Sequence, residues 1–186
     1  MGKIVKPLPV KLIVGLITQE ATFFDKAKNI LSKKFGNIDF ISPVLAFDQT
    51  AYYQKEMGRD LKRLFLSFEK LIPADKLVAI KLSTNKIEQK ISTSRHHRCV
   101  NIDPGYIALS KLVLATTKSF LHRLYIGAGI HEEITLYFRK NTFEPGPWTY
   151  PDYRLPVTIA LFNEIRKKYY EQIEKNYDHT QLYRSL

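Results

Sequence analysis

The sequence predicts one α+β domain with a mainly antiparallel sheet, helices packed on one face of that sheet and a ferredoxin-like beginning. Three observations carry this prediction. A chain of 186 residues can bury a core and suits a single domain. Short apolar segments with the pattern of strands are interspersed with three segments of helical periodicity. The later strands are joined by short links, which favours antiparallel neighbours.

The first hundred residues predict the order strand, helix, strand, strand, helix, strand, as in a split βαβ arrangement. Apolar residues recur at helical spacing from Phe23 to Phe35, and Gly36 is a natural end for that helix. Pro43 places its strand at an edge or a bulge, and Pro73 suits the first turn of a helix. The expected elements are a strand at 11–18, a helix at 23–35, strands at 38–47 and 64–72, a helix at 73–91 and a strand at 99–103.

The second half of the chain adds strands and a final helix. Gly127 to Gly129 supplies a turn, and the prolines and aromatic residues of 143–154 predict an ordered loop. The expected elements are strands at 111–117, 122–126 and 132–138 and a helix from about 156 to 175. We take residues 1–186 as a single domain, in which 1–10 lead into the first strand and 177–186 form a frayed tail.

Charge and composition narrow the class of protein. The formal net charge is +11, and the lysines are scattered along the chain. A basic surface can favour nucleic acid, acidic membranes or phosphorylated metabolites, or it can serve solubility alone. No apolar run approaches the roughly 20 residues that span a bilayer, so we expect no membrane partner. The single Cys99 excludes an intramolecular disulfide and a cysteine-cluster metal site, and we expect a cytoplasmic protein.

The common enzyme fingerprints are missing from the sequence. There is no Walker A loop, no Gly-rich dinucleotide fingerprint, no His-Glu-x-x-His pair and no Gly-x-Ser-x-Gly elbow. Polar residues instead gather at the ends of predicted strands. These strand ends are therefore the candidate positions for a functional site.

The stretch from Asn101 to Tyr106 interrupts apolar sequence with Asp-Pro-Gly, which predicts a tight turn. Asp103 either begins that turn or faces a ligand from a corner of the sheet. We interpret the motif as a functional corner, in which Asp103 faces a polar pocket with a cationic or metal-binding neighbour. Tyr106 then packs back against the sheet.

Alternation along 130–138 places Glu132 on the same face as Ile134 and Leu136. A carboxylate on an apolar face needs a cation, a metal or a proton, unless it lies past the core and meets water or an arginine. His122 falls on the same kind of face, as a proton carrier or as a structural histidine. The candidate catalytic residues are Asp103, His122 and Glu132, and Asp103 and Glu132 are candidate ligands for Mg²⁺.

Cationic and aromatic side chains near the strand ends suggest a ligand-binding rim. Arginine and lysine suit phosphate or carboxylate, although they can also form structural ion pairs. The aromatic residues of WTYPDYR either seal the sheet edge or stack on a ring. The candidate ligand-binding residues are Arg98, Asn101, Lys118, Arg123, Trp148, Asp152 and Arg154.

Several stretches carry a resemblance to a known family. They are NIDPGY (101–106), LVLATTK (112–118), the His122-Arg123 pair, EEITL (132–136) and WTYPDYR (148–154), together with SPVLAFDQTAYYQKEMG (42–58). Over nearly its whole length the chain resembles domain-of-unknown-function family 4416. Some members are labelled GTP-binding protein, although the chain lacks a Walker A loop. The resemblance implies no established catalytic residue.

We therefore expect either a ligand-binding protein or an enzyme, with a site at the strand ends for a phosphorylated or nucleotide-like small molecule. Two alternatives stay open, a basic nucleic-acid-binding module and a subunit whose aromatic loop docks a protein partner. Scattered lysines and the lack of a recognised RNA motif predict that any nucleic-acid binding is weak and unspecific.

Overall fold

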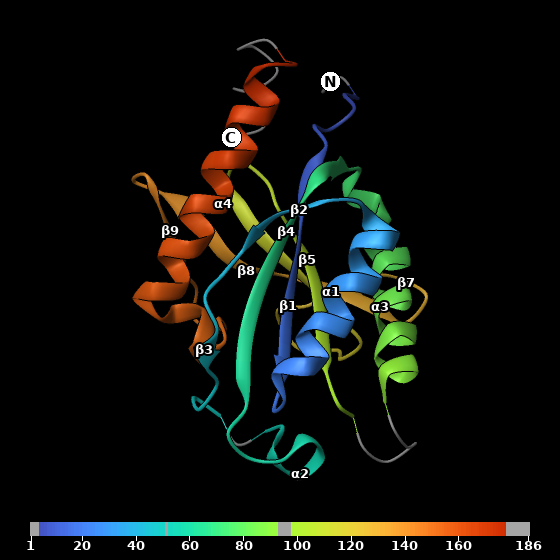
Figure 1. Cartoon of the computed structure of the whole chain (residues 1–186). Helices are drawn as coiled ribbons and strands as arrows, with labels where there is room; N and C mark the ends of the chain where they lie inside the picture. Colours follow the sequence, from blue (N-terminus) through green and yellow to red (C-terminus); the bar gives the residue numbers. More distant parts are fainter. Residues whose placement is uncertain (1–3, 51, 93–97, 178–186) are drawn as a thin grey trace.

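The computed structural model describes residues 4–50, 52–92 and 98–177 (Figure 1). Within these residues nine strands form one sheet in which every strand pair is antiparallel. The main path through the sheet is β2-β4-β1-β5-β6-β8-β7, with β3 beside β4 and β9 beside β8. The predicted α+β class and mainly antiparallel sheet are confirmed. None of the described helices is long and apolar enough to cross a bilayer.

The elements follow the predicted order with a few changes of boundary. They are β1 (Val10–Thr18), α1 (Ala21–Phe35), β2 (Ile38–Ile41), β3 (Leu45–Ala46), α2 (Gln54–Met57), β4 (Lys62–Ile72), η1 (Ala74–Lys76), α3 (Leu77–Ile91), β5 (Asn101–Ile107), β6 (Lys111–Thr116), β7 (Leu124–Gly127), β8 (Ile130–Arg139), β9 (Thr142–Pro145), η2 (Pro151–Arg154) and α4 (Pro156–Glu174). The strand predicted at 38–47 is divided at Pro43, as expected for a residue without a backbone donor.

The first half of the chain has the ferredoxin-like arrangement that the sequence predicts. Leaving out the short β3 and α2, its elements run β1, α1, β2, β4, α3, β5, and the strands lie in the order β2-β4-β1-β5. Strands β6, β8, β7 and β9 extend this sheet beyond β5.

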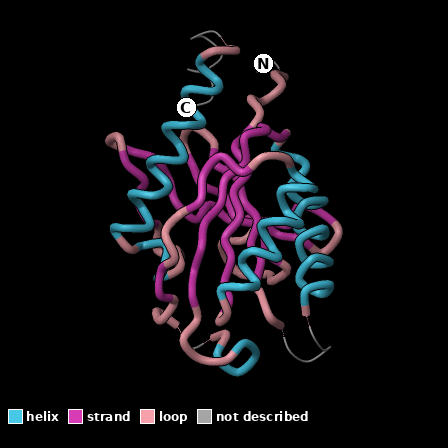
Figure 2. Tube along the Cα trace, viewed as in Figure 1, coloured by secondary structure: helices cyan, strands magenta, loops and turns pink. Residues whose placement is uncertain are grey.

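The helices lie on both faces of the sheet, which corrects the prediction that they share one (Figures 1 and 2). Leu12 and Val14 of β1 pack in one core with α1 and α3. Ile13 of β1 and Phe65 of β4 point the other way and pack in a second core with α4. Because both faces of these central strands are apolar, each face needs its own cover.

The Asp-Pro-Gly stretch lies inside β5, so the predicted turn at this position is wrong. Asp103 and Pro104 pair with Gly15 and Val14 of β1 on one edge of β5. On the other edge, β6 pairs only with Gly105 to Ile107. Proline is tolerated there because its missing N–H leaves no ladder bond unmade on the unpaired edge.

From Pro104 back to Asn101, β5 has no pairing with β6, and the two strands separate there. We call this divergence the fork. At the last paired position a Cβ on Gly105 would lie 2.2 Å from the carbonyl oxygen of Val113. The absence of a side chain therefore permits this close approach of β5 and β6, next to the point where they separate.

Candidate functional site

A cavity of about 1540 Å³ occupies the fork. Asn101 and Asp103 line it from β5, and Thr116 and Lys118 line it from β6 and the residues that follow. The rest of the lining comes from β1, β4, α3, the segment between β3 and β4, η2 and the residues just before β5, β7 and η2. The cavity therefore lies where a proline and a glycine allow two neighbouring strands to separate.

A buried guanidinium, that of Arg63 on β4, forms the floor of the fork. Its Nη2 donates to the Tyr153 hydroxyl at 2.7 Å and lies 3.4 Å from Asp152 Oδ2. Its Cζ lies 4.7 Å from the ring centre of Phe65. A Cβ on Gly15 of the intervening strand would come within 3.0 Å of Nη2, so this glycine leaves the guanidinium room to cross β1.

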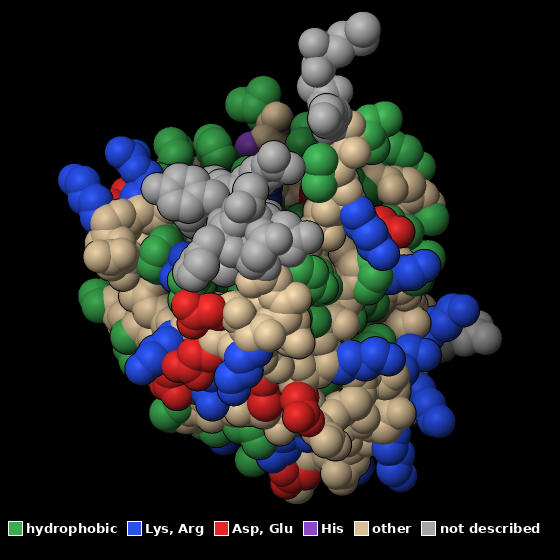
Figure 3. Space-filling view, turned by 90° about the horizontal axis from the view of Figure 1, so that it is seen from above, with side chains coloured by type: hydrophobic (Ala, Val, Ile, Leu, Met, Phe, Trp, Pro, Cys, Tyr) green, Lys and Arg blue, Asp and Glu red, His purple; other side chains and the backbone are tan. Residues whose placement is uncertain are grey.

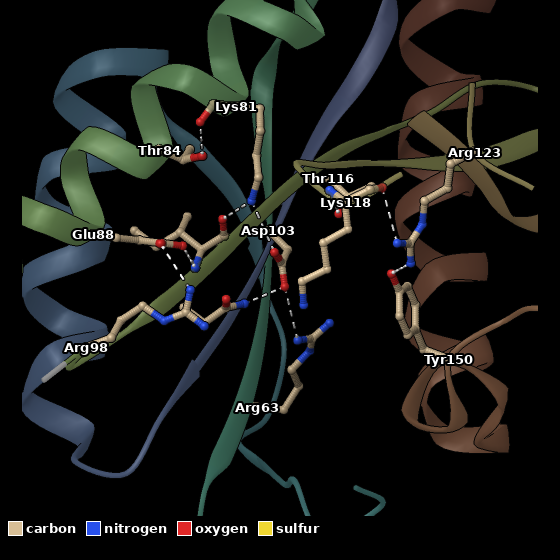
Figure 4. A network of polar contacts seen from close by, with 12 residues as sticks. Arg63, Lys81, Thr84, Glu88, Arg98, Asp103, Thr116, Lys118, Arg123 and Tyr150 are labelled. Atoms are coloured by element: carbon tan, nitrogen blue, oxygen red, sulfur yellow. Dashed lines mark hydrogen bonds and ion pairs between the residues drawn. The ribbon is translucent and has the colours of Figure 1, made fainter. Parts of the chain in front are cut away.

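Asp103 joins two cations from opposite faces of the sheet (Figure 4). Lys81 of α3 donates to its Oδ1 at 3.3 Å, and Arg63 lies 4.0 Å from its Oδ2, which also accepts from Asn101. Lys81 can reach Asp103 because the edge of β5 is unpaired here. Burial alone would raise the pKa of Asp103, but the charges of Lys81 and Arg63 and the hydrogen bonds from Asn101 and Lys81 together outweigh burial and lower it. The carboxylate is therefore ionised at neutral pH.

Glu88 of α3 is a second buried carboxyl in the wall of the cavity. It accepts a hydrogen bond from the Ile102 amide and lies 3.5 Å from Arg98 Nη1. Burial raises the pKa of Glu88 to about 7, against the opposing charge of Lys81. This side chain can therefore gain or lose a proton near neutral pH.

The raised pKa of Glu88 makes stability fall as pH rises. The folded protein holds this proton more tightly than the unfolded chain, whose pKa is near 4.5. Between these two values the folded state binds more protons, so raising the pH lowers the free energy of unfolding, by about 3 kcal/mol for this group. We expect Glu88→Gln to remove that part of the pH dependence, measured by urea unfolding at about pH 5 and about pH 8. An equal pH dependence in both proteins would contradict the assignment.

Two more cations line the cavity (Figure 4): Lys118, which follows β6, and Arg123, which precedes β7. Lys118 Nζ donates to the Tyr52 hydroxyl and lies 3.9 Å from the centre of that ring. Arg123 donates through Nη2 to the Tyr150 hydroxyl and through Nε to Glu133 Oε2, each at 2.7 Å. Arg123 is thereby fixed in the wall of the cavity by a phenol on one side and a buried carboxylate on the other.

The structure brings six of the ten predicted site residues together in the fork cavity, and these are Arg98, Asn101, Asp103, Lys118, Arg123 and Asp152. His122, Glu132 and Trp148 instead line a second, smaller cavity. Arg154 lines neither cavity and donates to the backbone carbonyls of Gly146, Pro147 and Thr149. It therefore fastens the loop before η2.

Glu133, not Glu132, is the more deeply buried carboxylate of β8, which corrects the parity argument. Glu133 pairs with Leu114 and Leu136 pairs with Leu112, so both face the side of β6 that carries its leucines. Three positions separate Glu133 from Leu136 because the register shifts at Thr135. This bulge reverses the alternation that the sequence pattern assumes.

The expected Mg²⁺ pair is also divided. Asp103 lines the fork cavity and Glu132 lines the second cavity, so the two carboxylates do not form one ligand set. Among the described residues no group of three or more His, Cys, Asp or Glu side chains is arranged to hold a metal ion. The neighbours of Asp103 are two cations and an amide, which suit an ionised carboxylate without a metal.

Sequence reasoning missed the buried polar residues of α3 and β4. Lys81 and Glu88 are both buried. Their separation of seven residues, two helical turns, places them on one side of the helix beside the apolar stripe, and that spacing could have revealed them. Arg63 has no comparable local signal, because its partners come from η2 and β5.

The comparisons with known proteins agree with the resemblance in the sequence. The family described as Domain of unknown function (DUF4416) matches residues 8–169. No curated protein and no solved structure matches the chain. The family match covers the whole sheet, both walls of the fork and most of α4. The chain therefore belongs to the DUF4416 family.

Proposed function

We propose that the fork cavity binds an anionic small molecule, with a phosphorylated, nucleotide-like compound as the ligand class. The observation that carries this proposal is the convergence of cationic side chains from separate segments of the chain. They are Arg63, Lys81, Arg98, Lys118 and Arg123. Phosphate groups are bound in proteins by such clusters of arginine and lysine.

The charge balance of the cavity changes with the proton of Glu88. Four acidic residues, Glu56, Glu88, Asp103 and Asp152, line the cavity beside the five cations, and Glu133 outside the lining pairs with Arg123, so the formal charges balance. When Glu88 holds a proton, the cavity has an excess of one positive charge, which favours an anion. Within the part of the chain described, no carboxylate lies within ion-pairing distance of Lys118. Its ammonium is therefore the cation best placed to meet a ligand.

Rings and amides in the same walls suit the rest of a nucleotide. Tyr52, Tyr53 and Tyr150 line the cavity, and tyrosine faces can stack on a base. Asn85 and Gln89 of α3 add side-chain amides, which offer both donors and acceptors to a planar heterocycle. On the face in Figure 3, Lys and Arg side chains lie next to Asp and Glu at the left and below, and at the right they have few acidic neighbours.

A thermal-shift series tests this proposal. The compounds are inorganic phosphate, pyrophosphate, and guanosine and adenosine with zero, one or three phosphates. We expect at least one phosphorylated compound, in about hundredfold excess over its Kd, to raise Tm by about 5 °C, and the bare nucleosides to raise it less. Lys118→Gln should reduce this shift, because it removes the ammonium without disturbing a buried ion pair.

Lys86→Gln is the matched control, since Lys86 is an exposed lysine of α3 that lines neither cavity. It should leave the ligand-induced shift unchanged. Equal loss of the shift in both lysine variants would indicate unspecific attraction to a basic protein. No shift with any phosphorylated compound would contradict the ligand class.

A further inference from the structure

The second cavity, of about 810 Å³, lies at the β7 edge of the sheet. Its lining residues belong to strands β5 to β8 and to the loops at 120–122 and 147–148, and none belongs to a described helix. Cross-strand pairing places Val113 beside Ile134 and Leu124 beside Glu132, so these side chains share one face of the sheet. We call this cavity and the side chains around it the open face.

Large apolar side chains of the open face are exposed to solvent. Their exposed fractions lie between 44% and 97%, and they are Phe120, Leu121, Leu124, Ile134 and Trp148. With about 200 Å² for a fully exposed side chain of this size, they present about 600 Å² of apolar surface. The largest apolar patch on a typical monomer measures about 300–600 Å², and it often marks a site of interaction. The open face therefore has the area of a recognition surface.

Leu121, the most exposed of these side chains, is a central residue of an anchored turn. The Arg123 amide donates to the Phe120 carbonyl at 3.0 Å, which closes the turn. The Arg123 guanidinium donates to Glu133 and to the Lys118 carbonyl, so it fastens the base of the turn. The exposed leucine is therefore already positioned before a partner binds, which lowers the entropic cost of association.

The open face is neutral, although the chain is strongly basic. Its lining includes Lys111 and Glu132, whose charges cancel, and Glu133, which is buried and paired with Arg123. The whole chain has a formal charge of +11. Nucleic acid and anionic membranes select basic surfaces. A neutral, apolar face instead favours a protein partner.

The open face is complementary to itself. In a two-fold symmetric interface each feature of a patch must find its complement on the same patch of the other copy. The exposed Leu121 adjoins a cavity with apolar walls, and Lys111 shares the face with the opposite charge of Glu132. A standard interface buries about 800 Å² per partner, about 65% of it apolar between identical subunits. The apolar surface of the open face suffices for one such interface.

We propose that the open face binds the open face of a second copy of this chain and forms a two-fold symmetric dimer. Leu121 of each copy enters the cavity of the other copy. Lys111 of each copy pairs with Glu132 of the other. The open face and the fork cavity have no lining residue in common, so this interface does not depend on the function proposed for the fork.

Sedimentation of the full chain at about 1 to 100 μM tests this proposal, and we expect the mass of two chains at the upper concentrations. Leu121→Asp should weaken dimerisation about a hundredfold, because each interface contains this residue twice. Val44→Asp is the control, since Val44 is an exposed apolar residue between β2 and β3 that lines neither cavity. It should dimerise as the parent does. The mass of a single chain at every concentration, or a dimer that Leu121→Asp leaves intact, would overturn the proposal.

Two charge reversals test the contact between the copies. Glu132→Lys and Lys111→Glu each place like charges across the interface, so each variant alone should dimerise at least about tenfold more weakly than the parent. An equal mixture of the two variants has opposite charges at both contacts and should recover the dimer. Recovery on mixing also shows that both variants are folded. A mixture that associates no better than its separate components would show that these side chains do not face each other, which contradicts the proposed interface.

Discussion

Gly105→Ala is expected to lower the free energy of unfolding by about 3 kcal/mol, because overpacking against a fixed backbone cannot relax cheaply. The added Cβ would lie 2.2 Å from the Val113 carbonyl oxygen and 2.7 Å from Leu114 Cδ2. The β5–β6 ladder is only three residue pairs long, so a shift at Gly105 disturbs much of it. The two strands would then separate at the pair where the fork begins.

Urea unfolding of purified variants measures this effect, with Gly146→Ala as the control. A Cβ on Gly146 would meet nothing nearer than the Trp148 ring at 3.5 Å, which is an ordinary contact. We expect the control to change stability by about 1 kcal/mol or less. Equal stability of the two alanine variants would contradict the close approach of β5 and β6.

Arg63→Met should also destabilise the fold, by about 3 kcal/mol, because it leaves buried carboxylates without their cation. Asp152 Oδ2 has no hydrogen-bond partner among the described residues, and the guanidinium 3.4 Å away is its nearest charge partner. Asp103 also loses a cation, although Lys81 remains. Methionine fills most of the space under Tyr153, so the change reports mainly on charge.

A second substitution identifies the cause of that loss. Adding Asp152→Asn to Arg63→Met removes one stranded charge and should restore part of the free energy of unfolding. Chemical unfolding of the two single variants and the double variant gives the coupling between the two residues. Independent, additive effects would mean that Arg63 acts through packing against Phe65 and Tyr153 rather than through its charge.

The sequence predicted the elements whose signals are local. The branched apolar run of β1 and the helical spacing of α1 and α3 were read correctly, and so was their ferredoxin-like order. Each of these depends on a period that the local chain carries by itself. The position of α4 depends on which face of a finished sheet remains uncovered, so it could not be read from the helix alone.

Where prediction failed, a long-range pairing overrode a local preference. Asp-Pro-Gly favours a turn, but β1 pairs with it along one edge and β6 leaves the other edge free. Glu132 was assigned to the buried face because alternation carries no sign of the bulge at Thr135. A single sequence shows neither the partner strand nor its register.

Six residues of the candidate site were predicted from the sequence, but its buried cations Arg63 and Lys81 were not. Asn101, Lys118 and Arg123 lie at strand ends, as the pattern suggested. Arg63 and Gly15 act as a pair, the glycine leaving the space that the guanidinium crosses, yet they are far apart in the sequence. No local pattern joins them.

The most direct test of the central claim, anion binding in the fork, is a crystal structure with the phosphorylated compound that raises Tm most. The account predicts that the phosphate lies between the separated ends of β5 and β6, within hydrogen-bond distance of Lys118 Nζ or the Arg98 guanidinium. Electron density for the compound only outside this cavity would contradict it.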